Sequence, residues 1–229
     1  MLQQTQVDRV CVKYPLFIKR FPSLKVLAGS SDADILGAWQ GLGYNRRALS
    51  LKRMAGMVLE RFAGKIPDDP LLLQELPGIG PATARSICAF AFNRPVVFIE
   101  TNIRSVFIHE FFKDKEGVTD DEIMPLVERT LDRDAPCRWY NALMDYGVEL
   151  KKKHANPSRK SASYIRQAAF EGSDRQIRGA IIRSLVAHEA MTRKKLFSVL
   201  DYAPARMAGI LEDLKREGLV KYNGGLLTL

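Results

Sequence analysis

The chain has 229 residues, of which 46% are hydrophobic and 27% are charged, and its formal net charge is +9. This composition is typical of a soluble globular protein that buries one large core or two modest ones, and it excludes a disordered chain. No apolar run reaches the length of a membrane span, which excludes a protein built on membrane-spanning helices.

The positive charge is confined to the last third of the chain. Residues 1–150 hold 19 Lys and Arg against 19 Asp and Glu, whereas residues 151–229 hold 16 against 7. A basic surface neutralises phosphates and releases counterions, so this distribution favours a nucleic acid as partner. Charge alone does not separate DNA from RNA or from an acidic membrane surface.

Three cysteines, Cys11, Cys88 and Cys137, are spread along the chain. Their odd number and wide spacing fit neither a disulfide framework nor a four-cysteine metal site. We expect each to be a small buried hydrophobe in a reducing compartment. The first residues, MLQQTQVDRV, lack the continuous apolar segment of a signal peptide, so we expect a cytoplasmic protein.

Helical periodicity dominates the first ninety residues. Apolar residues between Val7 and Ile18 recur at the spacing of one helical face. The polar cluster at 31–34 is typical of an N-cap, and a long helix is predicted from the glycine turn at 41–44 to about Phe62. This part of the chain is therefore predicted to be helical throughout.

The stretch LPGIG at residues 76–80 is a tight turn between two helical segments. Pro77 presets one backbone angle, while Gly78 and Gly80 are able to adopt positive φ and to let bare backbone approach a neighbour. The turn leaves N–H groups free at the start of the apolar helix over 82–92, which is a seat for a phosphate oxygen. An ordinary helix–helix corner is the alternative interpretation of the glycines alone.

A single carboxylate, Glu100, follows the apolar run at 96–99 and precedes a helix through Val106 and Phe107. A negative charge is favourable at this end of a helix. From its placement alone, Glu100 is a carboxylate that caps the helix.

Three stretches together resemble the helix-hairpin-helix DNA glycosylase superfamily, in its branch of MutY-like and endonuclease III-like enzymes. They are MLQQTQV at 1–7, GLGYNRRA at 41–48 and LPGIGPATA at 76–84, and the match continues through Met-Asp-Tyr-Gly at 144–147. The resemblance covers about residues 1–150 with its motifs in order. It implies a helical DNA repair enzyme that turns a base out of the duplex.

The resemblance also implies roles for individual residues. Gln4 and Tyr44 would wedge into the base stack, because an amide and an aromatic ring can replace lost pairing and stacking, and Leu42 would lie nearby. A buried core aromatic is the alternative for Tyr44. Glu100 takes the place of the family's aspartate, which stabilises the cationic sugar as the glycosidic bond breaks. The implied DNA-contacting set is Gln4, Thr5, Leu42, Tyr44, Gly78, Ile79, Gly80, Thr83 and Asn102.

Three departures from the family pattern bear on activity. Bifunctional members carry a lysine where this chain has Ala82, so we expect a monofunctional enzyme in which water attacks and no strand is cut. Glu100 is one methylene longer than the family's aspartate, which shifts its charge. MutY-like enzymes carry a glutamate two residues before the position of Met1, and that proton donor is not in the sequence. Either the reading frame begins upstream, or turnover on adenine is impaired.

Most MutY-like relatives bind an iron–sulfur cluster through four cysteines after the Met-Asp-Tyr-Gly stretch. Residues 151–160 instead read KKKHANPSRK, without a cysteine, so we expect no cluster and no other metal centre. This cationic linker either touches backbone phosphates or is a solvated loop. The resemblance leaves a monovalent cation at the hairpin carbonyls as a possible ligand.

Residues 173–229 have the pattern of a winged helix. Three predicted helices precede two short strands joined by a turn at 223–225. In that fold the third helix is the usual reader of the DNA groove, and here it offers Arg206, Lys215 and Arg216. Winged helices also serve as protein-binding modules, so the pattern does not decide between DNA and protein.

We therefore predict a mainly α chain with a helix-hairpin-helix glycosylase domain at 1–150, a basic linker at 151–172 and a winged-helix domain at 173–229. The predicted function is a monofunctional DNA glycosylase in base excision repair, acting on adenine opposite 8-oxoguanine or guanine. Its partner is double-stranded DNA with a mismatch or lesion, and we expect a nucleoid-associated monomer. The alternatives are a catalytically impaired binder of damaged DNA and a winged-helix regulator with a retired glycosylase domain.

Overall fold

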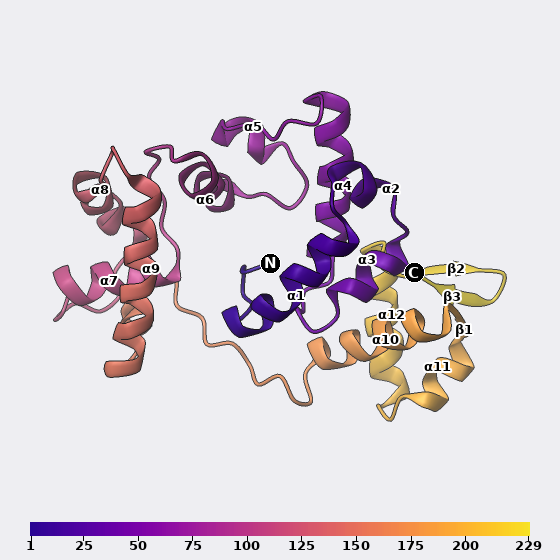
Figure 1. Cartoon of the computed structure of the whole chain (residues 1–229). Helices are drawn as coiled ribbons and strands as arrows, with labels where there is room; N and C mark the ends of the chain where they lie inside the picture. The colour runs from indigo at the N-terminus through magenta and orange to yellow at the C-terminus, as the bar shows by residue number, and fades with distance from the viewer. The chain divides into compact units, whose positions relative to one another are not determined.

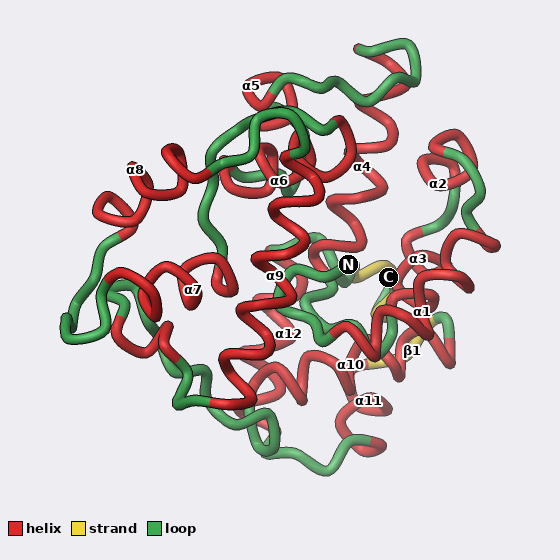
Figure 2. Tube along the Cα trace, turned by 60° about the vertical axis from the view of Figure 1, so that its left-hand side comes forward, coloured by secondary structure: helices red, strands yellow, loops and turns green.

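The computed structural model describes residues 1–229 and consists of twelve α-helices, one 3-10 helix and a three-stranded sheet (Figures 1 and 2). The prediction of a mainly helical chain is confirmed. The chain folds as two units, each with its own core: unit 1 comprises residues 1–65 and 168–229, and unit 2 comprises residues 66–167. No helix is both long and apolar enough to cross a membrane.

Unit 1 is built from two stretches that lie far apart in the sequence. Its elements are α1 (Val7–Arg20), α2 (Leu24–Gly29), α3 (Asp32–Trp39), α4 (Arg46–Arg61), α10 (Asp174–His188), β1 (Ala190–Thr192), α11 (Arg193–Val199), α12 (Pro204–Arg216), β2 (Lys221–Asn223) and β3 (Leu226–Thr228). Side-chain caps set several of these boundaries. The hydroxyls of Ser23, Ser31 and Thr192 accept hydrogen bonds from backbone N–H groups at the starts of α2, α3 and α11.

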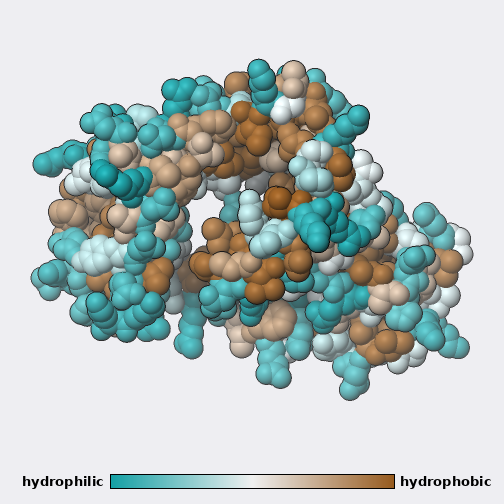
Figure 3. Space-filling view, in the orientation of Figure 1, coloured by the Kyte–Doolittle hydropathy of each residue, from teal (hydrophilic) through white to brown (hydrophobic).

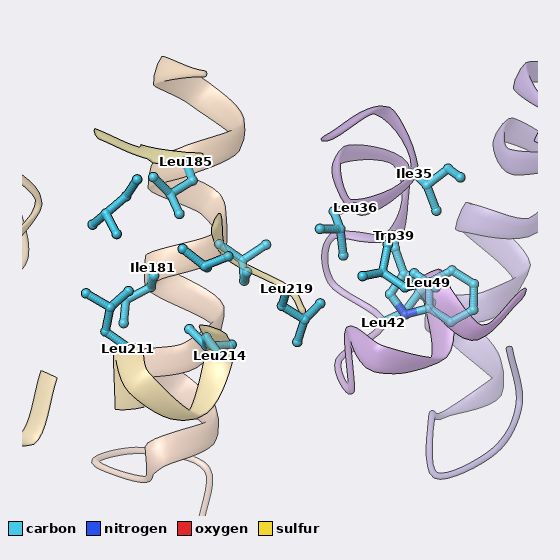
Figure 4. Packing of buried hydrophobic residues seen from close by; sticks show 14 of the residues in the cluster. Ile35, Leu36, Trp39, Leu42, Leu49, Ile181, Leu185, Leu211, Leu214 and Leu219 are labelled. Atoms are coloured by element: carbon cyan, nitrogen blue, oxygen red, sulfur yellow. The ribbon is translucent and has the colours of Figure 1, made fainter. Parts of the chain in front are cut away.

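One hydrophobic core joins the two stretches of unit 1. Ile35 and Leu36 of α3 share it with Ile181 and Leu185 of α10, and all four side chains are buried (Figure 4). At Gly37, an added Cβ would lie 3.4 Å from the Val186 side chain, so α3 and α10 pack closely. The units therefore differ from the predicted division at 150 and 173, because the apolar side of α10 packs on the N-terminal helices.

The C-terminal sheet has one strand more than the predicted hairpin. β3 lies between β1 and β2 and pairs antiparallel with both, with Met191 and Tyr222 opposite Leu227. Gly224 and Gly225 form the turn, with φ of 56° and 87°, as a tight hairpin requires. β1 is missed from the sequence because three residues carry too little alternation to indicate a strand.

Unit 2 surrounds a second core. Its elements are α5 (Pro70–Gln74), α6 (Pro81–Phe92), α7 (Thr101–Phe111), α8 (Asp120–Thr130), α9 (Pro136–Lys153) and the 3-10 helix η1 (Pro157–Lys160). The Tyr140 hydroxyl of α9 donates to the Val96 carbonyl at 2.8 Å and accepts from the Phe98 N–H at 3.3 Å. These bonds fix the extended segment that leads to Glu100 against α9.

Helix α1 is less buried than its periodicity predicts. Only Val10 and Phe17 are buried, whereas Cys11 is exposed and Val12 and Leu16 are 66% and 61% exposed. Apolar residues accordingly reach the surface where Figure 1 places α1 (Figure 3). The expectation of three buried cysteines is wrong for Cys11, because the narrow stripe that packs on α3 does not include it. Cys88 is buried and Cys137 is half-buried.

Candidate active site

Arg47, in the first turn of α4, holds two of the predicted motifs together in unit 1. Its Nη1 donates to the carbonyls of Met1 (3.0 Å) and Gln3, and its Nη2 donates to the Thr5 hydroxyl at 2.8 Å. Nη2 also donates to the carbonyls of Leu42 and Gly43, at 3.0 and 3.1 Å. The N-terminal stretch and the glycine turn at 41–44 thus form one surface, fastened by a single guanidinium.

Burial and stacking complete the surroundings of Arg47. The guanidinium carbon lies 5.4 Å from the ring centre of Trp39 and 5.6 Å from that of Tyr44. Burial lowers the pKa of Arg47 from its ordinary value, and its Nε is a buried donor without a partner. A buried donor without a hydrogen-bond partner lowers the stability of the fold. Arg47 therefore holds the two segments in place at some cost in stability.

Gln4 and Tyr44 both adopt the left-handed backbone conformation that non-glycine residues rarely occupy. Their φ angles are 54° and 48°, and both residues are exposed, Tyr44 to 40%. Strained backbone of this kind is found preferentially at functional sites. The alternative of a core aromatic does not hold for Tyr44.

The Leu42 side chain is too deeply buried in this structure to contact DNA. The side chain is 2% exposed and belongs to the core of unit 1. Its carbonyl accepts from the Thr5 hydroxyl at 2.9 Å as well as from Arg47. Leu42 therefore serves as an anchor of the turn, because the apolar side chain turns inward between two exposed glycines. Thr5 is half-buried and is bonded to this anchor.

In unit 2, the hairpin has the expected turn between α5 and α6. Gly78 has φ of 81°, as predicted, but Gly80 has φ of −90°, which any residue adopts. A Cβ added to Gly80 would meet nothing within 4 Å, so bare backbone here faces open space. Gly80 supplies no side-chain cap to α6, and Pro81 has no N–H that would need one, although the Gly80 carbonyl accepts the first intrahelical hydrogen bond from the Ala84 N–H at 2.9 Å. Ile79 and Thr83 flank this opening.

Glu100 is the N-cap of α7 and is half-buried. Its Oε1 accepts a hydrogen bond from the backbone N–H of Asn102 at 3.0 Å, while Oε2 has no hydrogen-bond partner. The capping role is therefore present, and one carboxylate oxygen remains available. A cap that uses one oxygen fixes the direction of the other.

Helix α9 packs closely against the start of α7. An added Cβ at Gly147 would lie 2.6 Å from the Asn102 carbonyl oxygen, so only glycine permits this approach. One turn later, Lys151 Nζ donates to Asn102 Oδ1 at 2.6 Å. Burial lowers the pKa of Lys151, and the nearby charge of Glu100 opposes that shift. The Asn102 side chain is thus occupied within the protein, although it was expected to contact DNA.

Three residues of this arrangement were missed from the sequence as site residues: Arg47, Gly147 and Lys151. Arg47 stood in a matching motif, and its position directly after a glycine turn was a signal for a backbone-binding role. Gly147 is a glycine inside a predicted helix, which indicates a close contact. Lys151 carried no signal, since it opens a run of three lysines.

The segment after α9 does not fit an iron–sulfur cluster. Residues 151–229 contain no cysteine, and no group of three or more His, Cys, Asp or Glu side chains is arranged to hold a metal ion. Hydrogen bonds secure the segment instead: Val118 N–H donates to the Lys160 carbonyl and Ala162 N–H donates to the Val118 carbonyl, both at 2.9 Å. Ser158, which is buried, donates to Asn156 Oδ1 at 2.8 Å.

The cations that α12 was expected to offer to a DNA groove are engaged with carboxylates. Arg206 Nη2 lies 2.6 Å from Asp174, Lys215 lies 3.0 Å from Glu212 and Arg216 lies 2.8 Å from Asp213. These exposed pairs contribute little to stability, but they cancel charge locally.

Known proteins are similar to this chain over most of its length. The profile of the HhH-GPD superfamily of base excision DNA repair proteins matches residues 1–217. An adenine DNA glycosylase of Mycobacterium tuberculosis is 30% identical over 243 residues, a match that covers 96% of this chain and 79% of the relative.

Two solved structures share the fold at low identity. A thermostable thymine-DNA glycosylase superposes with a TM-score of 0.58 at 20% identity, over 69% of this chain and 75% of the other. Endonuclease III, trapped as a covalent intermediate with DNA, superposes with a TM-score of 0.51 at 19% identity, over 66% of this chain and 69% of the other.

Proposed function

The chain belongs to the HhH-GPD superfamily of base excision DNA repair proteins, and we propose that it is a monofunctional DNA glycosylase that removes adenine opposite 8-oxoguanine or guanine. The observation that carries the proposal is the geometry of Glu100, whose Oε1 caps α7 while Oε2 has no partner. The choice of adenine rests on the adenine DNA glycosylases among its relatives.

The proposed reaction is dissociative. The bond between C1′ and the base nitrogen breaks, the bonding electrons leave with the base, and positive charge develops on the sugar ring. A fixed carboxylate that is only partly solvated stabilises this cation more than it stabilises the neutral substrate. Water then adds to C1′ and loses a proton to the solvent, while the nitrogen of the departing base takes up a proton from the solvent, so that an abasic site and the neutral free base remain.

The hairpin of unit 2 and the surface of unit 1 formed by the N-terminal stretch with Gln4 and the glycine turn with Tyr44, which we call the wedge surface, are each proposed to bind the duplex. The start of α6 after Gly80 would accept a backbone phosphate, because it has no side-chain cap at Gly80, the space beside Gly80 is open, and the positive end of the helix dipole lies there. Gln4 and Tyr44 would enter the base stack when the target base turns out. Ala82 offers no amine, so no imine with the abasic sugar is expected at this position.

Single-turnover base release tests this proposal. Duplexes with A opposite 8-oxoguanine, A opposite G, T opposite G and U opposite G are incubated with excess protein, with and without alkali. Alkali-dependent cleavage at adenine is the expected result. Glu100→Gln should abolish it, because the glutamine oxygen can still cap α7 while the charge is lost.

The matched control is Glu128→Gln, which makes the same chemical change at an exposed side chain of α8. It should release base at the wild-type rate. Tight binding of the lesion duplex without base release would contradict the proposal of a glycosylase and favour a protein that only binds damaged DNA. Strand cleavage without alkali would contradict the monofunctional assignment.

A further inference from the structure

Two groups of cations in the C-terminal part of unit 1, on α11 and on α12, differ in their counter-ions. On α12 and its flanks, residues 203–217 hold three basic and three acidic residues, so their net charge is zero. Residues 190–200 hold three basic residues, Arg193, Lys194 and Lys195, and no acidic residue. We call Arg193, Lys194 and Lys195 the basic turn.

The basic turn is exposed, and none of its three cations has a carboxylate within 4 Å. It forms the first turn of α11, where the Thr192 hydroxyl caps the Lys195 N–H at 3.2 Å. Arg193 lies over the Phe197 ring at 5.1 Å from its centre, which directs the guanidinium along the surface. The three charges are therefore held together on one short, capped element.

This placement does not serve the stability of α11. Basic side chains stabilise a helix at its C-terminal end, and at the N-terminal end they meet the positive end of the helix dipole. In α3 and α10 the first turn instead carries acidic residues, Asp32 and Asp34 in α3 and Asp174 in α10. A cluster of cations placed against the dipole and without counter-ions concentrates positive potential, which suits a polyanion.

We propose that the basic turn is a second contact surface for duplex DNA, which binds backbone phosphates independently of sequence, and that α12 does not read the groove. The proposal rests on the DNA partner of the proposed function but not on catalysis. Each cation that neutralises a phosphate releases a counterion, so the surface adds affinity that salt weakens.

The salt dependence of binding measures this contribution. Dissociation constants for an undamaged duplex and for a duplex with A opposite 8-oxoguanine are determined between low and high salt. In Arg193→Gln/Lys194→Gln/Lys195→Gln, the slope of log Kd against log salt should fall by about 2 to 3 on both duplexes. The thermal midpoint of this variant should be no lower than that of the wild type, since the removed charges oppose the dipole.

The matched control is Arg206→Gln/Lys215→Gln/Arg216→Gln, which removes the same formal charge from α12. Its slope should remain close to that of the wild type, and a larger loss here than in the basic-turn variant would overturn the proposal. Unchanged binding by the basic-turn variant would also overturn it, even if base release is intact. Failure of the wild type to bind either duplex would instead contradict the proposed function.

Discussion

At the scale of single residues, Arg47 is the connection on which the wedge surface depends. It donates to four carbonyls and one hydroxyl from two segments that are about forty residues apart. Lysine cannot replace it, because one ammonium group cannot span acceptors that a planar fork reaches together. The exposed wedge residues Gln4 and Tyr44 take their positions from this inner contact.

Arg47→Met should lower the free energy of unfolding by about 2 to 4 kcal/mol, since it leaves several acceptors unpaired. Arg47→Lys should recover only part of that loss. Urea denaturation followed by circular dichroism measures both. The neighbouring Arg46 is exposed, and Arg46→Met should change stability by no more than about 0.5 kcal/mol.

For Gly147→Ala, helix propensity and packing predict changes in stability of opposite sign. Alanine in the interior of a helix is ordinarily more stable than glycine by about 1 kcal/mol. Gly147→Ala should instead destabilise by about 1 to 3 kcal/mol, because its Cβ would lie 2.6 Å from the Asn102 carbonyl oxygen. It should also reduce base release, because the start of α7 carries Glu100.

The control for Gly147 is Gly56 in α4, where an added Cβ meets nothing within 4 Å. Gly56→Ala should raise the thermal midpoint, whereas Gly147→Ala should lower it. An increase in both variants would mean that α9 does not press on the start of α7.

At the scale of elements, the hairpin contains two glycines with different roles. Gly78 is required for its backbone conformation, whereas Gly80 is proposed to leave space for a phosphate. Gly78→Ala should destabilise by about 1 to 2 kcal/mol, because φ of 81° strains any side chain. Gly80→Ala should leave stability unchanged and weaken duplex binding, because its Cβ would occupy the space proposed for a phosphate. Thermal melts and binding isotherms of the two variants test this reversal.

Tyr140 links α9 to the segment before Glu100 and makes that link sensitive to alkali. Burial raises the pKa of Tyr140 from 10 to about 12. A raised folded-state pKa gives stability that is present below pH 10 and is lost as the pH rises to 12, by about 2 to 3 kcal/mol. The wild type should therefore be more stable than Tyr140→Phe at pH 8 and lose that advantage toward pH 12, as urea denaturation at each pH would show.

At the scale of the whole molecule, the sequence predicts what local chemistry determines. The glycine turns, the hairpin and the helix that begins after Glu100 lie where their residues indicate. The sharing of one core by α3 and α10 was not predictable, because the apolar face of a helix does not show which other helix it packs against. The inward position of Leu42 and the Lys151–Asn102 bond likewise depend on contacts between distant segments.

This shared core predicts the result of truncation. A chain that ends at Gln167 loses α10, α12 and the sheet, and it exposes the buried faces of Ile35 and Leu36. Unit 1 should then fail to fold, while Tyr140 and the rest of unit 2 keep their protected amides. Hydrogen exchange distinguishes the two regions, and persistent protection in α3 would contradict a common core.

We propose that the charge of Glu100 drives base release. The most direct measurement is the single-turnover rate on A opposite 8-oxoguanine for the wild type, Glu100→Gln and Glu100→Asp, with duplex affinity measured alongside. We expect alkali-dependent release by the wild type, none by Glu100→Gln despite unchanged affinity, and release by Glu100→Asp, which keeps the charge. Equal rates for the wild type and Glu100→Gln would contradict it.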